Sequence, residues 1–173
     1  AVLSLALAGG VSALAATTPP TTVAIRAVTS QKVVINRYVQ DGLRWQRDDY
    51  TVKSGGTIHL IQLAADEGPH SFSIVNPKDA PKTLKQLNDC KICKTLSDAH
   101  GADPNQQGPP KFNFLENGTG QDTAPNVDRP GDSAIFGNAK GDTQDLKVTA
   151  PKGKNLYFMC IIHPQMQAMV HVR

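Results

Sequence analysis

The last stretch of the chain places three possible metal ligands within seven residues, and it constrains the fold more than any other. Cys160, His163 and Met166 come at the end of a run of β-forming residues, 156–160, so these side chains leave a strand together and enter the loop after it. Free cysteine and methionine are common in protein cores, and a sulfur-rich core strand is therefore the alternative interpretation. The tight spacing with a histidine favours a metal site, which needs a second histidine from elsewhere in the chain.

His70 is the candidate for that second histidine. It directly follows the Gly68-Pro69 turn between two predicted strands, 57–63 and 71–75, and this position fixes its side chain at the edge of a loop. Sulfur ligands together with imidazole favour copper, and two histidines with one cysteine and a weak axial methionine form the blue-copper arrangement. The predicted copper ligands are His70, Cys160, His163 and Met166.

Two methionines compete for the axial position. Met166 lies in the loop, whereas Met169 falls in the closing strand predicted over residues 168–173. A methionine in a strand is more often an ordinary core residue, and we therefore expect Met166 to be the ligand.

Composition and the N-terminal stretch limit the class of protein. With 14 glycines, 12 prolines and a net charge of +3 without a basic cluster, the sequence predicts a β-rich, loop-heavy domain that does not bind nucleic acid. Residues 1–16 form an apolar run of small residues typical of a signal peptide or an N-terminal membrane anchor, and residues 17–22 form a Thr/Pro spacer. We therefore expect a periplasmic or other extracytoplasmic location, with possible membrane association through the N-terminal segment.

The other two cysteines lie in a segment of different character. Residues 76–145 are expected to be an insertion over the β-core, with a helix beginning near an Asp79 N-cap and a long irregular part rich in Gly, Pro and Asn. Cys90 and Cys93 form a C-x-x-C pair on this helix. A structural disulfide, a second metal or partner-docking site with His100, and a redox dithiol all remain open for this pair.

The residues around the predicted ligands resemble a known family. Gly68-Pro-His70 together with Cys160-x-x-His163-x-x-Met166 is similar to the cupredoxins, and the spacing of the ligand loop is most like that of amicyanin. The resemblance covers about residues 45–76 and 145–173. It implies an all-β, cupredoxin-like Greek-key β-sandwich over residues 23–173, one type 1 copper ion and electron transfer through His163. Ser71 stands where many members of the family carry asparagine.

The sequence thus predicts an exported blue-copper electron-transfer protein that exchanges single electrons with redox partners, such as a cytochrome or a membrane redox complex. A copper-binding accessory subunit of a membrane redox complex and a periplasmic copper carrier are the alternatives. An enzyme is not expected, because the remaining histidines include no H-x-H pair for a second copper site. Two of them, His59 and His171, fall in strand patterns and are expected to be ordinary strand residues.

Overall fold

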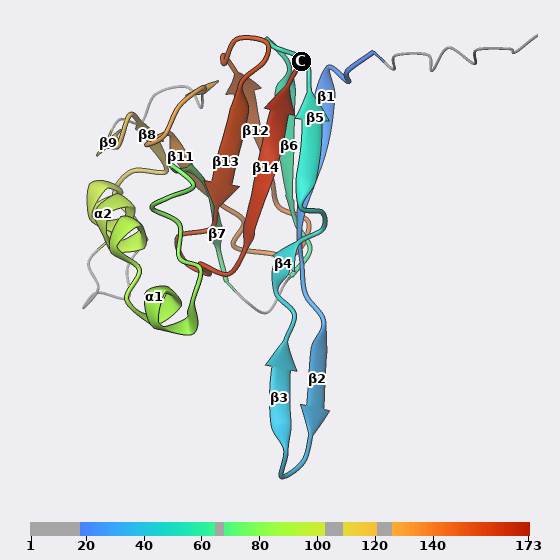
Figure 1. Ribbon diagram of the computed structural model, residues 1–173, viewed down its shortest axis with the longest axis vertical. Coiled ribbons are helices and arrows are strands. Elements are labelled where there is room, and N and C mark those ends of the chain that lie inside the picture. Colours follow the sequence, from blue (N-terminus) through green and yellow to red (C-terminus); the bar gives the residue numbers. More distant parts are fainter. Residues whose placement is uncertain (1–17, 65–67, 103–108, 121–125) are drawn as a thin grey trace, which may run out of the picture.

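Two β-sheets pack face to face in the computed structural model, which describes residues 18–64, 68–102, 109–120 and 126–173 (Figure 1). The first sheet has the strand order β10-β12-β6-β1-β4, and the second has the order β5-β14-β13-β7-β11-β8-β9. The first comprises β1 (Thr22–Val28), β4 (Arg44–Trp45), β6 (Thr57–Gln62), β10 (Asn126–Val127) and β12 (Thr143–Val148). The second comprises β5 (Asp49–Val52), β7 (His70–Ile74), β8 (Phe114–Glu116), β9 (Thr119–Gly120), β11 (Ser133–Phe136), β13 (Asn155–Met159) and β14 (Gln167–Val172). This β-sandwich confirms the predicted fold class.

Alternation of apolar and polar residues builds the core between the sheets. In β1, Val23, Ile25 and Ala27 are buried while their neighbours are partly exposed, because successive strand residues point to opposite faces. An aromatic cluster lies at the centre, where the rings of Phe72 and Phe158 stack with centroids 4.3 Å apart. Burial of these apolar surfaces is the main force that holds the two sheets together.

The expected helix begins later than predicted and is broken in two. The helices are α1 (Leu84–Asn88) and α2 (Lys91–Ala99), and Asp79 caps neither of them. Thr83 is the N-cap of α1, and its hydroxyl accepts a hydrogen bond from the Gln86 amide (3.3 Å). Asp79 instead closes a turn with Asn76, which keeps it outside the helix. Asp89 and Cys90 leave the helical conformation, and Cys90 then caps α2.

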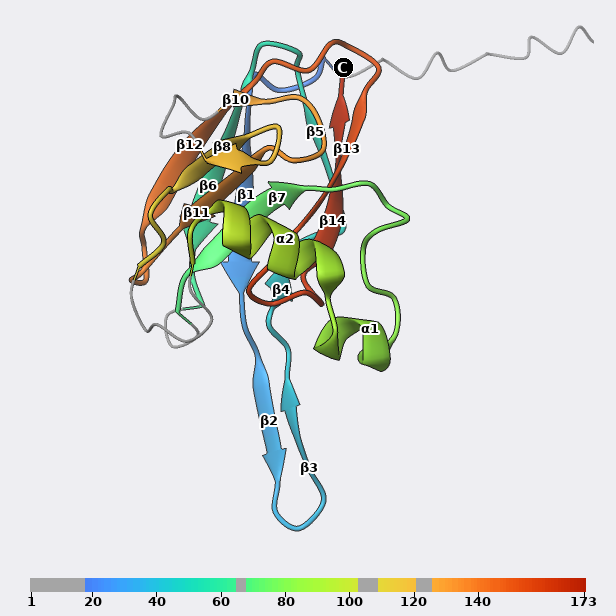
Figure 2. The ribbon, with the colours of Figure 1, turned by 90° about the vertical axis from the view of Figure 1, so that its left-hand side faces the viewer.

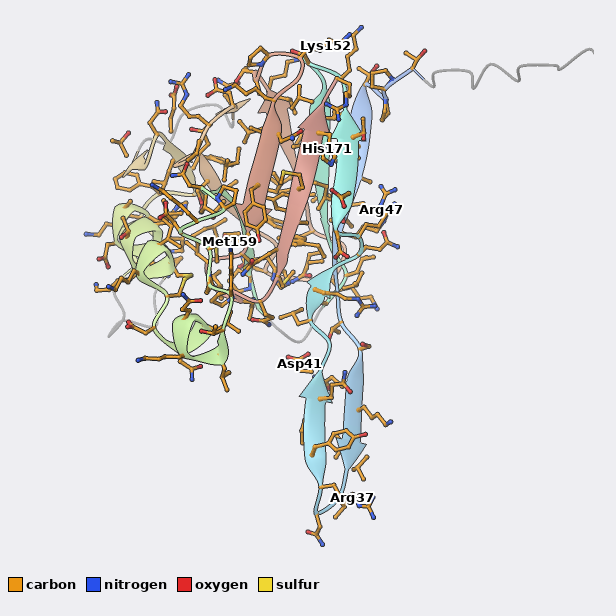
Figure 3. The ribbon with its side chains drawn as sticks, in the orientation of Figure 1. Arg37, Asp41, Arg47, Lys152, Met159 and His171 are labelled. Carbon is orange, nitrogen blue, oxygen red and sulfur yellow. A yellow bond between two sulfur atoms is a disulfide. The ribbon has the colours of Figure 1, made fainter. Side chains whose placement is uncertain are left out.

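Helix α2 covers the outer face of the second sheet (Figure 2). Cys93 and Leu96 of this helix share a second apolar cluster with residues of that sheet, among them Met159, which is labelled in Figure 3. The predicted insertion is also partly built into the sandwich, since β11 pairs with both β7 and β8. The outer face beside the ligand loop is therefore shielded from water by residues of the 76–145 segment.

A hairpin of β2 (Gln31–Val34) and β3 (Tyr38–Asp41) projects from one end of the sandwich, with Arg37 near its tip (Figures 1 and 3). Its strands pair with each other and leave Val33, Ile35 and Val39 60–78% exposed. Among the described residues, no helix has the length and apolar character required to cross a membrane. The predicted signal or anchor segment, residues 1–16, lies outside the described residues.

Candidate metal centre

His70 is held rigidly at the start of β7. The turn before it uses Gly68 with a positive φ of 73°, a conformation that glycine adopts without strain. The buried Gln62 side chain fixes this turn, because its amide nitrogen donates to the Gly68 carbonyl (2.8 Å) while its amide oxygen accepts from the Ala64 backbone N–H (3.0 Å). His70 is fully buried, and its ring lies against Trp45, with centroids 6.2 Å apart.

Cys160 and His163 lie in the short loop between β13 and β14, at the end of the sandwich from which the hairpin projects (Figure 1). Two backbone hydrogen bonds close this loop: the Cys160 N–H donates to the Met166 carbonyl (3.0 Å), and the Met166 N–H donates to the His163 carbonyl (2.9 Å). Cys160 is fully buried and is a free thiol, whereas His163 is half-buried. The loop therefore presents one side chain to the interior and one toward the surface.

The structure brings His70, Cys160 and His163 together. The Cys160 Sγ lies 3.9 Å from the His70 Nδ1 and 3.8 Å from the His163 Nδ1. A metal–sulfur bond of about 2.3 Å and a metal–nitrogen bond of about 2.0 Å, meeting at about 120°, place the two atoms roughly 3.7 Å apart. The observed separations fit a metal held between the three side chains, and the donor set fits copper.

Burial and hydrogen bonding set the charge states of these ligands. Burial lowers the pKa of His70 to about 4, with the nearby His163 contributing, so the His70 imidazole is neutral near pH 7 and free to donate its lone pair. Burial raises the pKa of the Cys160 thiol, while hydrogen bonds from the backbone N–H groups of Ser71 (3.3 Å) and His163 (3.4 Å) oppose this rise. A bound metal would hold the thiol in its deprotonated form.

Met166 and Met169 lie in different surroundings. Met166 is 1% exposed and belongs to the same core cluster as Cys160. Met169 sits in β14, opposite Tyr157 of β13, and is half-buried. Met166 is therefore the methionine that lies in the loop and shares a buried cluster with Cys160.

The remaining cysteines and histidines have other partners. Cys90 and Cys93 are joined by a disulfide, so neither offers a thiolate to a metal. His59 lies 2.6 Å from the Asp145 carboxylate, and His171 contacts both Asp49 and Asn155. These two histidines thus form polar contacts along strands.

Reasoning from the sequence assigned no role to the polar side chains that support the ligands. Ser71 accepts a hydrogen bond from the Ile161 N–H (2.8 Å) through its hydroxyl, and this bond ties the start of β7 to the ligand loop. Gln62 supports the turn before His70, as described above. The one available signal was the pair Ser71 and Ser73, polar residues that alternate along a strand buried at every position.

Comparison with known proteins gives structural matches alone. No family model matches the sequence, and neither does any curated protein. Reduced auracyanin from Roseiflexus castenholzii is 16% identical with a TM-score of 0.44, and the match covers 90% of this chain and 99% of that one. Auracyanin A, a "blue" copper protein from Chloroflexus aurantiacus, is 17% identical with a TM-score of 0.41, covering 89% of this chain and 99% of that one.

A mutant of amicyanin in its reduced Cu(I) form is 10% identical with a TM-score of 0.42, and the match covers 90% of this chain and 92% of that one. TM-scores this low carry no argument about function. The two-sheet sandwich brings His70, Cys160 and His163 together, and the buried Met166 belongs to the same core cluster as Cys160.

Proposed function

We propose that the chain is an exported blue-copper electron-transfer protein that passes single electrons through one type 1 copper ion. His70, Cys160 and His163 would be the three strong ligands and Met166 the weak axial one. One observation carries the proposal: two imidazole Nδ1 atoms lie 3.8 and 3.9 Å from the sulfur of a fully buried free cysteine. Copper bound there would supply one-electron chemistry between Cu(II) and Cu(I).

The protein side chains favour fast exchange of an electron over chemistry on a substrate. His70, Cys160 and Met166 are at most 1% exposed, so these side chains keep water away from the site. The strands and the closed loop hold the ligands in fixed positions, so little rearrangement is needed when the charge of the site changes. We therefore infer a carrier rather than an enzyme.

His163 provides the route to the surface. It is the half-buried member of the cluster, and its neighbour Ile162 is 41% exposed. An exposed apolar side chain beside the ligand suits brief docking with a limited interface, as electron-transfer partners require. The proposed partners are redox proteins outside the cytoplasm, such as a cytochrome or a membrane redox complex.

Spectroscopy of the protein loaded with Cu(II) tests the proposal. We expect strong visible absorption from thiolate-to-copper charge transfer and a mononuclear Cu(II) EPR signal, with one copper ion per chain. Cys160→Ser should abolish the absorption, while the control His171→Gln, which alters a strand histidine that contacts Asp49 and Asn155, should leave it unchanged. A loaded wild-type protein without this absorption would refute the proposed function.

A further inference from the structure

A chain of buried hydrogen bonds runs from the ligand loop to the helical segment on the outer face of the second sheet. It begins at the Ile161 N–H, which donates to the Ser71 Oγ (2.8 Å). The Ser71 and Ser73 hydroxyls lie 2.9 Å apart, and the Ser73 and Ser133 hydroxyls 2.6 Å apart. The chain ends at His100, whose Nε2 lies 2.8 Å from the Ser133 Oγ.

Sheet register and burial make this series of hydrogen bonds continuous. Ser71 and Ser73 share the outer face of β7, and Ser133 of β11 is the direct partner of Ser73 across the strand pair. His100 is the C-cap of α2 and is fully buried, and the three serines are at most 3% exposed. Buried hydroxyls need hydrogen-bond partners, and each of these serines receives them from the next member of the chain.

The His100 end of this series of hydrogen bonds determines which group donates in each of them. The His100 Nδ1 lies 2.7 Å from the Phe112 carbonyl oxygen, which only accepts, so Nδ1 carries the proton. Burial lowers the pKa of His100, opposed by the bond to the Phe112 carbonyl, so the ring is neutral near pH 7. In a neutral ring with Nδ1 protonated, Nε2 accepts a hydrogen bond from the Ser133 hydroxyl.

The donor and acceptor roles of the three serines follow from this, in order from His100 back to the metal centre. Ser133 donates to His100 and therefore accepts from Ser73, and Ser73 in turn accepts from Ser71. The Cys160 sulfur is the second acceptor open to the Ser71 hydroxyl, because the Ser71 backbone N–H donates to that sulfur (3.3 Å) and the hydroxyl itself is bound to the next residue of the loop, Ile161 (2.8 Å). This hydroxyl carries one proton, which goes to the Ser73 oxygen or to the Cys160 sulfur.

We propose that His100 is a positioning residue for the metal centre: by accepting a hydrogen bond from Ser133 it orients the hydroxyls of Ser73 and Ser71 away from the Cys160 sulfur. The effect on the metal rests on the proposed blue-copper function. The directions in which the serine hydroxyls donate their hydrogen bonds do not depend on it. A hydrogen bond donated to the ligand sulfur withdraws electron density and stabilises the reduced metal, so His100 keeps the reduction potential lower than it would otherwise be. The helical segment thus acts on the redox centre without touching a ligand.

The direction of these hydrogen bonds is tested first in the metal-free protein, by ¹⁵N NMR of the histidine rings. We expect the His100 Nδ1 to carry the proton and its Nε2 to show the shift of an unprotonated nitrogen accepting a hydrogen bond. In Ser133→Ala the Nε2 signal should move toward that of a free imidazole nitrogen. A His100 ring protonated at Nε2 in the wild-type protein would overturn the proposal, whether or not the protein binds copper.

The effect on the metal is tested by voltammetry of the copper-loaded protein. Ser73→Ala, Ser133→Ala and His100→Phe each interrupt the chain, freeing the Ser71 proton to turn to Cys160, and all three should raise the reduction potential. Thr95→Ala is the control, since the Thr95 hydroxyl donates to the Lys91 carbonyl within α2, outside the chain. Ser133→Ala decides the result if His100→Phe does not fold. Unchanged or lowered potentials in both serine variants would overturn the proposal, whereas a protein that takes up no copper would refute the proposed function and leave the NMR result to decide.

Discussion

Acidification from pH 7 to about 4 should destabilise the metal-free protein, because His70 is neutral when folded and becomes charged when the chain unfolds. Its pKa is about 4 in the folded protein against the ordinary value of 6.5. A lowered histidine pKa contributes stability that is fully present above pH 6.5 and is lost as the pH falls toward 4. The difference of 2.5 pH units (6.5 minus 4), at about 1.4 kcal/mol per unit, corresponds to roughly 3 kcal/mol of unfolding free energy.

Guanidinium unfolding at several pH values, followed by fluorescence of the single tryptophan, measures this loss. Trp45 is 2% exposed and lies against the His70 ring, so it reports on the relevant region. Other groups also take up protons in acid, and the His70 share is therefore read as the difference between the wild type and His70→Gln, whose stability should depend less on pH by about 3 kcal/mol. Bound copper should reduce this loss of stability in the wild type, since a ligated imidazole does not take up a proton. Equal losses in the metal-free wild type and variant would refute the reasoning.

Three further predictions concern packing, the axial ligand and the disulfide. Phe158→Ala should lower the unfolding free energy by about 3–5 kcal/mol in chemical denaturation, because the buried ring packs against three other aromatic rings; a loss below about 1 kcal/mol would contradict the packing described. Met166→Leu should keep the charge-transfer absorption of the copper-loaded protein and raise its reduction potential, because an axial ligand tunes the site more than it builds it; loss of the absorption would show a larger role. Replacing both Cys90 and Cys93 by alanine should cost about 2 kcal/mol or less, since the disulfide closes a loop with a sequence separation of 3, and should leave the absorption unchanged.

Local patterns in the sequence predicted much of the sandwich. The strand expected over 57–63 is β6, Thr57–Gln62, and the strand expected over 71–75 is β7, His70–Ile74. The Gly68-Pro69 turn and the run ending at Cys160 were visible because turn residues and β-branched runs leave signals within a few positions. These same signals identified the three side chains that the structure gathers.

Features that depend on distant pairing could not be read from the sequence. The 4-residue strand β11 lies within a stretch rich in glycine and aspartate, and its place beside β7 depends on a register between strands roughly sixty residues apart. The contact of Ser73 with Ser133 follows from that register. The break between α1 and α2 was missed because helical spacing of leucines continues across Asp89 and Cys90, while the backbone does not.

The separation of His70 and Cys160 by 90 positions would give a metal bound to both a role in folding. A metal bound to both side chains closes a long loop in the same topological sense as a disulfide, and a cross-link over about 100 residues is worth on the order of 4–5 kcal/mol of chain entropy. Neither ligand reaches the other until β7 and β13 have paired. Tight capture of the ion would therefore be a late event in folding, and loss of the ion would remove the longest cross-link in a chain whose single disulfide among the described cysteines spans one helical turn.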